Sequence, residues 1–327
     1  IVYNIVYNIM GQRNKKTKRK TKGKAKFKMV TSPLSNAIVN DDLKKVKNLL
    51  KKGANPNEFT NEWCSSKVKP LREHLHINCE VYEIWNKGDL GTLLHLALFL
   101  RNKKIIHALL DHSVDRIDVN KTHIKDDYTS LHFAVYCGLD IVKKIYKLGC
   151  TDINRKDMDG NPVLMHTLLR DYTPQKDSKL DIIKFLIDKG AFVNVKNKKD
   201  GYTPLDLASR LGHIDVIKYL ISKGAHINNL NKRNRTPLHE CIVSSKNSNA
   251  NKLQVVKLLI DKGAKINTIS KETRHTPLSS ATAYGLSNIV KLLLSKGSKK
   301  NIKNKDNMTA LDVAKWNNYK SIENMLQ

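Results

Sequence analysis

A segment of about 33 residues recurs along most of this 327-residue chain, and its clearest copy runs from Gly201 to Asn228. A period in the low thirties indicates one supersecondary unit stacked on copies of itself. Such units bury a common core only when neighbours stack. The recurrence therefore predicts an elongated array, and it moves the functional question from catalysis to binding.

The copies align on a short motif that opens each unit. Its second position is occupied by Pro204, Pro237, Pro277 and Ala310, in steps of 33, 40 and 33 residues. The step of 40 indicates an insertion at about 244–251. Earlier copies open with related sequences, which we align as Ser32-Pro33-Leu34, Thr92-Leu93-Leu94, Thr129-Ser130-Leu131 and Asn161-Pro162-Val163.

Each copy has the residues of two short helices and a turn. Thr203 can cap a first helix through its side-chain oxygen, and Pro204 suits the first helical position. The second helix carries apolar residues at helical spacing, and Gly224 suits the left-handed position after it. Ala208 is small enough to allow close packing between neighbouring helices.

The openings, together with closes such as Gly190-Ala191-Phe192-Val193-Asn194 and Gly263-Ala264-Lys265-Ile266-Asn267, resemble the ankyrin repeat. The resemblance implies an all-α solenoid of about 7–8 helix-turn-helix units with projecting β-turn fingers. We divide the chain into a basic, disordered tail (1–30), repeat 1 (31–57), an insert or degenerate repeat (58–90), and repeats 2–8 with a C-terminal cap (91–327).

Four histidines, His95, His132, His166 and His239, align with the fourth place of the opening motif. This regularity is typical of a structural role rather than of a ligand or a catalytic group. The resemblance implies that each bonds the preceding threonine and the neighbouring loop.

The chain is strongly basic, with 59 Lys and Arg against 30 Asp and Glu and a net charge of +29. Basicity of this size favours an anionic partner, although a lysine-rich surface encoded by an AT-rich genome has the same composition. The fingers place cations along one edge of the array. The partner-binding residues we predict are Lys156, Lys198, Lys199, Lys232, Arg233, Arg235, Arg274 and Lys305.

From these patterns we predict a scaffold that binds a protein partner, an acidic one, through the concave helical face and the basic fingertips. The alternative is a nucleic-acid-associated protein that uses the tail and the basic edge. Its affinity would fall steeply with salt. Aromatic residues make up only 6% of the chain, which leaves little for base stacking.

Two segments stand outside the repeat pattern. Residues 58–90 contain Cys64, His74, His76 and Cys79, four side chains of the types that bind zinc, but their spacing matches no known zinc motif. Residues 13–28 hold ten positive charges and no acidic residue. This run is typical of an import signal or an anion contact, and equally of a solubilising tail or an extension upstream of Met29.

No enzyme signature occurs, so we predict no catalytic residues and no cofactor. The five cysteines are odd in number, widely spread and without a C-x-x-C pair, which favours a reducing, intracellular compartment, without distinguishing cytoplasm, nucleus or a host cell. No apolar run reaches the length of a membrane span. We expect a monomer.

Overall fold

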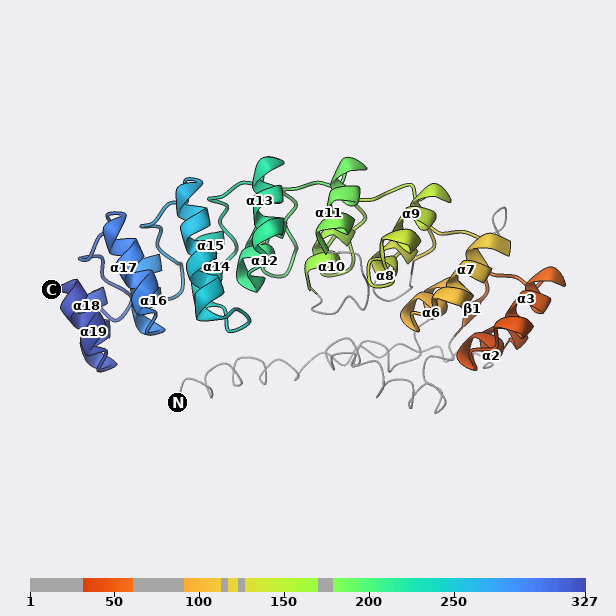
Figure 1. The fold of residues 1–327 in the computed structure, drawn as a ribbon, viewed down its shortest axis with the longest axis horizontal. Helices are drawn as coiled ribbons and strands as arrows, with labels where there is room; N and C mark the ends of the chain where they lie inside the picture. The colour runs from red at the N-terminus through yellow and green to blue at the C-terminus, as the bar shows by residue number, and fades with distance from the viewer. Residues whose placement is uncertain (1–31, 61–90, 113–116, 123–126, 170–178) are drawn as a thin grey trace, which may run out of the picture. The chain divides into compact units, whose positions relative to one another are not determined.

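The computed structural model describes residues 32–60, 91–112, 117–122, 127–169 and 179–327. Within these residues the chain forms eight pairs of short helices, coloured in chain order in Figure 1. We call the first helix of each pair inner and the second outer. The inner helices are α2 (Pro33–Val39), α6 (Leu93–Phe99), α8 (Ser130–Ala134), α10 (Val163–Leu169), α12 (Pro204–Leu211), α14 (Pro237–Val243), α16 (Pro277–Ala283) and α18 (Ala310–Trp316). The outer helices are α3 (Leu43–Lys51), α7 (Lys103–His112), α9 (Leu139–Lys147), α11 (Lys179–Asp188), α13 (Ile214–Ser222), α15 (Asn249–Asp261), α17 (Ser287–Ser295) and α19 (Lys320–Leu326).

The pairs stack side by side, which confirms the predicted all-α repeat architecture. Inner helices pack against inner helices, as α12 does against α10 and α14, and outer helices pack against outer ones, as α15 does against α17. In the fifth pair Leu205 and Ala208 of α12, and Ile217 and Leu220 of α13, are buried. Full burial of one such aliphatic side chain stabilises the fold by about 1.5–3 kcal/mol. Buried apolar side chains from all eight pairs belong to one hydrophobic cluster, so the core is continuous from pair to pair.

Six of the eight described inner helices, α6, α8, α12, α14, α16 and α18, begin at reciprocal caps. Thr203 Oγ1 accepts a hydrogen bond from the Asp206 backbone N–H at 3.2 Å, and the Asp206 carboxylate accepts one from the Thr203 N–H at 2.8 Å. Each bond satisfies an amide that the helix itself leaves without a partner. The side chain at the fourth place of the motif thus caps the start of the helix, whether that residue is Asp, Ser or His. The histidines in this role are His95, His132 and His239.

His166 does not share that role, so our alignment of the fourth copy was wrong by one residue. The antiparallel bridge Lys156↔Pro162 is equivalent to Thr122↔Thr129, which puts Pro162 at the place of the capping threonine. His166 therefore falls one place later and bonds the Asp157 carboxylate instead, at 2.8 Å. The error of one residue arose because the second place of the motif is a proline in several other copies, so Pro162 was aligned with that place instead of with the first.

Asparagine side chains tie each repeat to the next at the closes. Asn154 Nδ2 donates to the Gly190 carbonyl at 3.0 Å, and its Oδ1 accepts from the Phe192 N–H at 2.8 Å. Each such bond contributes about 0.5–1.5 kcal/mol net. We call this series the asparagine ladder. The same pair of bonds recurs at Asn120, Asn194 and Asn228.

The first two repeats stack directly on each other. Helix α2 packs on α6 and α3 on α7, and Asn57 Oδ1 accepts from the Asp118 N–H at 2.8 Å. Strands β1 (Phe59–Thr60) and β2 (Gly91–Thr92) pair antiparallel between these repeats. No helix pair therefore lies between repeats 1 and 2 among the described residues.

The last pair differs from those before it. Lys315 of α18 is exposed at the place that Thr282 occupies, buried, in α16. Glu323 of α19 likewise replaces the buried Val290 of α17. These two places of the last described pair therefore carry charged side chains where the preceding pair carries buried uncharged ones.

Candidate partner-binding surface

The fingers are the loops between the close of one repeat and the capping residue of the next. In the finger before α12, Asn197 is buried, and its Oδ1 accepts hydrogen bonds from the N–H groups of Asp200 and Tyr202 at 3.2 and 2.9 Å. Asn231 and Asn304 hold their fingers in the same way. A buried side chain thus fixes the shape of each finger from within.

Backbone hydrogen bonds join successive fingers. The Lys198 N–H donates to the Asp159 carbonyl at 2.9 Å, and the same bond recurs from Lys232, Lys271 and Lys305 to the finger before each. These four exposed lysines therefore stand at equivalent places in consecutive fingers. We call them the fingertip lysine row: Lys198, Lys232, Lys271 and Lys305.

Two glycines permit this close stacking of fingers. Gly160 has φ +80°, and a Cβ there would lie 2.7 Å from the Lys198 backbone nitrogen. Gly201 has φ +71°, and its Cβ would lie 3.1 Å from the Lys232 nitrogen. The left-handed backbone and the approach of the next finger therefore favour glycine at both places, and the contact is closest at Gly160.

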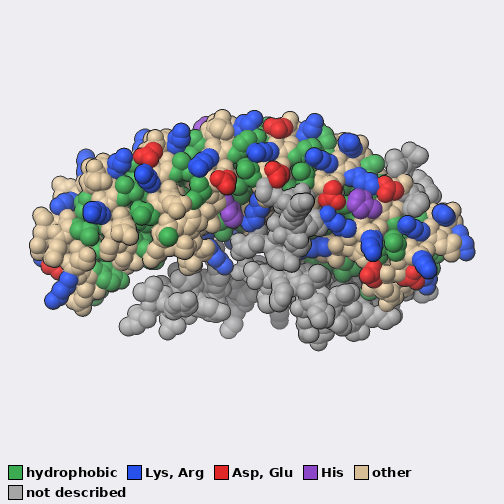
Figure 2. Space-filling model, in the orientation of Figure 1, with side chains coloured by type: hydrophobic (Ala, Val, Ile, Leu, Met, Phe, Trp, Pro, Cys, Tyr) green, Lys and Arg blue, Asp and Glu red, His purple; other side chains and the backbone are tan. Residues whose placement is uncertain are grey.

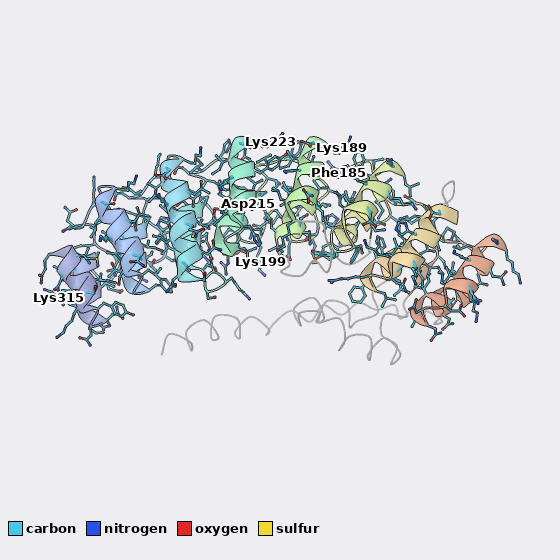
Figure 3. All side chains as sticks on the ribbon, in the orientation of Figure 1. Phe185, Lys189, Lys199, Asp215, Lys223 and Lys315 are labelled. Carbon is cyan, nitrogen blue, oxygen red and sulfur yellow. The ribbon has the colours of Figure 1, made fainter. Side chains whose placement is uncertain are left out.

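The fingertip lysines carry charge without nearby carboxylates. None of the four has a carboxylate oxygen within 4.0 Å among the described residues. Several lysines on the outer helices or directly after them form ion pairs between repeats, such as Lys223 with Asp188 at 3.5 Å and Lys296 with Asp261 at 3.4 Å. In Figure 3, Lys223 and Lys189 lie together at the ends of α13 and α11, away from Lys199.

The predicted binding residues do not all lie on the surface. Lys156, Lys198, Lys199, Lys232, Arg233, Arg274 and Lys305 are exposed. Arg235 is not: only 17% of its side chain is exposed, and its guanidinium lies 3.9 Å from the Glu240 carboxylate. The sequence reasoning also missed Lys271. Lys271 directly follows Ser270, and Ser270 stands where other fingers have a buried asparagine. This position in the finger was the signal that could have identified Lys271.

Glu240 makes a buried polar junction between α12 and α14. Its carboxylate is fully buried and accepts hydrogen bonds from Tyr202 OH at 3.1 Å and Asn231 Nδ2 at 3.0 Å, with Arg210 Nη1 at 3.3 Å. Burial and the Glu240 charge raise the pKa of Tyr202 to about 12. All these groups are paired, so the junction holds two repeats together and leaves no reactive group exposed.

A second buried cluster lies between the third and fourth pairs. The rings of His132 and His166 meet edge to face with centroids 5.0 Å apart, and Tyr136 OH is 3.0 Å from His166 Nδ1. Burial and the neighbouring His166 lower the pKa of His132 to about 3. Burial acts to raise the pKa of Asp157, but the hydrogen bond and charge of His166 outweigh it and lower that pKa. The cluster is enclosed, which favours a packing role.

The described residues offer few other groups that could bind a metal ion or act as a nucleophile. In the part of the chain that the structure describes, no three His, Cys, Asp or Glu side chains are grouped to hold a metal ion. The zinc candidates Cys64, His74, His76 and Cys79 lie outside the described residues, as does the basic tail. Burial raises the pKa of the Cys241 thiol to about 12, which makes it inert as a nucleophile. None of the described helices is both long and apolar enough for a membrane crossing.

Comparison with known proteins bears on the fold and the kind of function. The family model "Ankyrin repeats (3 copies)" matches residues 34–157, 172–270 and 243–327. The chain belongs to the ankyrin repeat family. Ankyrin repeats generally mediate protein–protein interaction and are typically without enzymatic activity.

One relative of this ankyrin chain is the fowlpox virus (strain NVSL) ankyrin repeat protein FPV222. The two are 30% identical over 180 residues, which is 55% of this chain and 19% of the relative. The match thus spans about a fifth of the viral protein's length. It supports the repeat architecture of the ankyrin array.

Proposed function

We propose that this ankyrin array is a non-enzymatic scaffold that binds an acidic protein partner along its basic fingers and the adjoining face of the inner helices. The observation that carries the proposal is the fingertip lysine row. Backbone hydrogen bonds fix Lys198, Lys232, Lys271 and Lys305 in register, and all four are exposed without a carboxylate nearby among the described residues. Exposed charge in a fixed array speeds encounter and selects partners of opposite charge.

Charge elsewhere on the surface is partly offset by acidic residues. On the face in Figure 2, Asp and Glu side chains are interspersed among the Lys and Arg. The pairs Lys144–Asp111 and Lys103–Asp140 join successive outer helices. An anionic partner gains less from lysines that already face a carboxylate. The fingertips are therefore the favoured contact.

The test is a pair of charge-reversed variants of the full chain with equal net charge. One carries Lys198→Glu, Lys232→Glu, Lys271→Glu and Lys305→Glu. The control carries the same change at four exposed lysines of the outer helices: Lys184, Lys218, Lys257 and Lys291. Labelled polyglutamate is titrated into each at about physiological ionic strength, where the Debye length is about 8 Å.

We expect the fingertip variant to bind polyglutamate at least tenfold more weakly than the control variant. If the two variants lost affinity for polyglutamate equally, net charge alone would determine binding, and the proposal would be abandoned. A parallel titration with duplex DNA tests the nucleic-acid alternative. DNA affinity that exceeds polyglutamate affinity, and that depends on the fingertip row, would replace the protein partner with a nucleic acid.

A further inference from the structure

The most exposed of the large apolar side chains in the described residues is Trp316, at 80%. Tyr284 is 52% exposed. Trp316 is the last residue of α18, and Tyr284 follows the last residue of α16. These two inner helices pack against each other, so both aromatic residues stand at the same end of neighbouring helices.

A third aromatic residue fixes this end of the two repeats. The ring of Tyr319 lies where a Cβ on Gly285 would be only 3.2 Å away. The chain after Tyr284 is therefore in contact with the chain after Trp316. Because packed helix axes are roughly 8–10 Å apart, the Tyr284 and Trp316 side chains start about one helix spacing from each other. A single bulky group of a partner can span that distance.

The repeat pattern does not require either exposed ring. At the place of Trp316, the equivalent inner helices carry Arg210, Val243 and Ala283. A position that tolerates arginine, valine and alanine contributes little to the shared core. Trp and Tyr are the residue types in which binding energy concentrates at protein interfaces. Exposure of both at one end is thus better explained by binding than by folding.

The surroundings of these rings are basic. Between residues 276 and 327 there are eight lysines and three acidic residues, Asp306, Asp312 and Glu323. Lys315 is exposed directly before Trp316, as labelled in Figure 3, and Lys320 is exposed directly after Tyr319. Charge complementarity therefore favours an occupant that combines carboxylates with an apolar group.

We propose that Tyr284 and Trp316 form an anchor site for an aromatic or large apolar side chain carried by an acidic protein segment, with Lys315 and Lys320 facing its carboxylates. The inference rests on the proposed scaffold function and adds to it the kind of side chain that the partner must present. A single-stranded nucleic acid fits less well. It would need stacking rings along the whole basic edge, and the fingertip row carries none.

The test compares two probes of equal length and label: polyglutamate, and a copolymer of glutamate and tyrosine. Both are titrated into the full chain, into the double variant Trp316→Ala with Tyr284→Ala, and into the control variant Phe192→Ala. Phe192 is 64% exposed but lies in the close after α11, far along the chain from α16 and α18. All three side chains are exposed, so the variants should keep the thermal midpoint of the parent.

We expect the parent chain to bind the copolymer about tenfold more tightly than polyglutamate. The double variant should lose this preference and bind both probes alike, whereas Phe192→Ala should keep it. Equal affinity of the parent for both probes, or equal loss with Phe192→Ala, would overturn the anchor site. The fingertip variant should bind both probes more weakly, and by the same factor. Failure of the anchor site is therefore distinguishable from failure of the scaffold function.

Two further measurements assign the surface to other occupants. Concentration-dependent association of the parent chain in sedimentation, absent from the double variant, would make the occupant a second copy. Tighter binding of labelled oligothymidine than of the copolymer, lost in the double variant, would make it a nucleic acid. Either result would overturn the proposal.

Discussion

The carboxylate of Asp206 lies 2.7 Å from the hydroxyl of Thr203, in the fully buried place that His95, His132 and His239 fill in other repeats. One of its oxygens, Oδ2, accepts bonds from Thr203 and Asn229, while Oδ1 has no partner. Burial raises the pKa of Asp206 to about 6, against the hydrogen bonds that lower it. The fifth repeat thus caps its helix with a group that is costly to ionise.

Replacing Asp206 with histidine should stabilise the chain at neutral pH. Because the folded pKa of Asp206 is above its unfolded value of 3.8, its contribution is fully present below that value and is lost as pH rises through about 6. Asp206→His removes this penalty, up to about 3 kcal/mol at pH 7.5, and restores the bond that neutral histidine makes elsewhere. Urea unfolding at pH 7.5 and 5 measures the gain, which should shrink at the lower pH. Asp312→His, at the equivalent exposed place in α18, is the control and should change little.

The buried histidines should make the array sensitive to acid. Burial lowers the pKa of His132 to about 3 and of His239 to about 4. A histidine with a depressed folded pKa contributes stability that is fully present above its unfolded pKa of 6.5 and is lost as pH falls toward the folded value. Each residue contributes a slope of about 1.4 kcal/mol per pH unit in that window.

Thermal midpoints measured from pH 7.5 to pH 4.5 test this. His239→Gln should be less stable than the parent at pH 7.5, because its cap is lost, yet its midpoint should fall less on acidification. A pH dependence unchanged by His239→Gln would show that other groups dominate.

Gly160→Ala should destabilise the array more than Gly190→Ala does. Both glycines have positive φ, +80° and +94°, and therefore share the left-handed penalty of about 1–2 kcal/mol. Only at Gly160 would the new methyl group meet the next finger, 2.7 Å from the Lys198 nitrogen, whereas at Gly190 it meets nothing within 4 Å. The difference in unfolding free energy between the two variants measures finger stacking. No difference would mean that the fingers move apart freely.

Asn154→Ala should weaken the junction between the fourth repeat and its predecessor in the chain. The change removes the bonds to the Gly190 carbonyl and the Phe192 N–H and costs about 1–3 kcal/mol. Asn288→Ala, on the exposed face of α17, serves as the control. Hydrogen exchange of the Phe192 amide should accelerate in Asn154→Ala and stay unchanged in Asn288→Ala.

The repeat, its helix caps and its buried alanines could be predicted from residue types and their spacing in the sequence. Thr203, Pro204 and Ala208 act through their own backbone or nearest helix, so their roles follow from residue type and spacing. His166 was misassigned because Pro162 fits two places of the motif, and only the backbone bridge at Lys156 sets the register.

The candidate site was predictable only in part. Exposed fingertip cations follow from turn residues, and Lys198, Lys232 and Lys305 are exposed as expected. The burial of Arg235 depends on Glu240 in the following helix, a pairing that no local pattern signals. The exposure of Trp316 emerges only once the neighbouring helices are packed.

The hydrogen bonds between fingers set a regular interval between the lysines of the fingertip row. Because a backbone hydrogen bond joins each fingertip to the one before it, the backbones of the four lysines repeat at the pitch of the array, and their ammonium groups can shift only within the reach of the side chains. Two acidic segments with the same composition but different intervals between their carboxylates should therefore be told apart. Selectivity of this kind resides in spacing, and a mutation that lengthens a single finger would alter it without changing any charge.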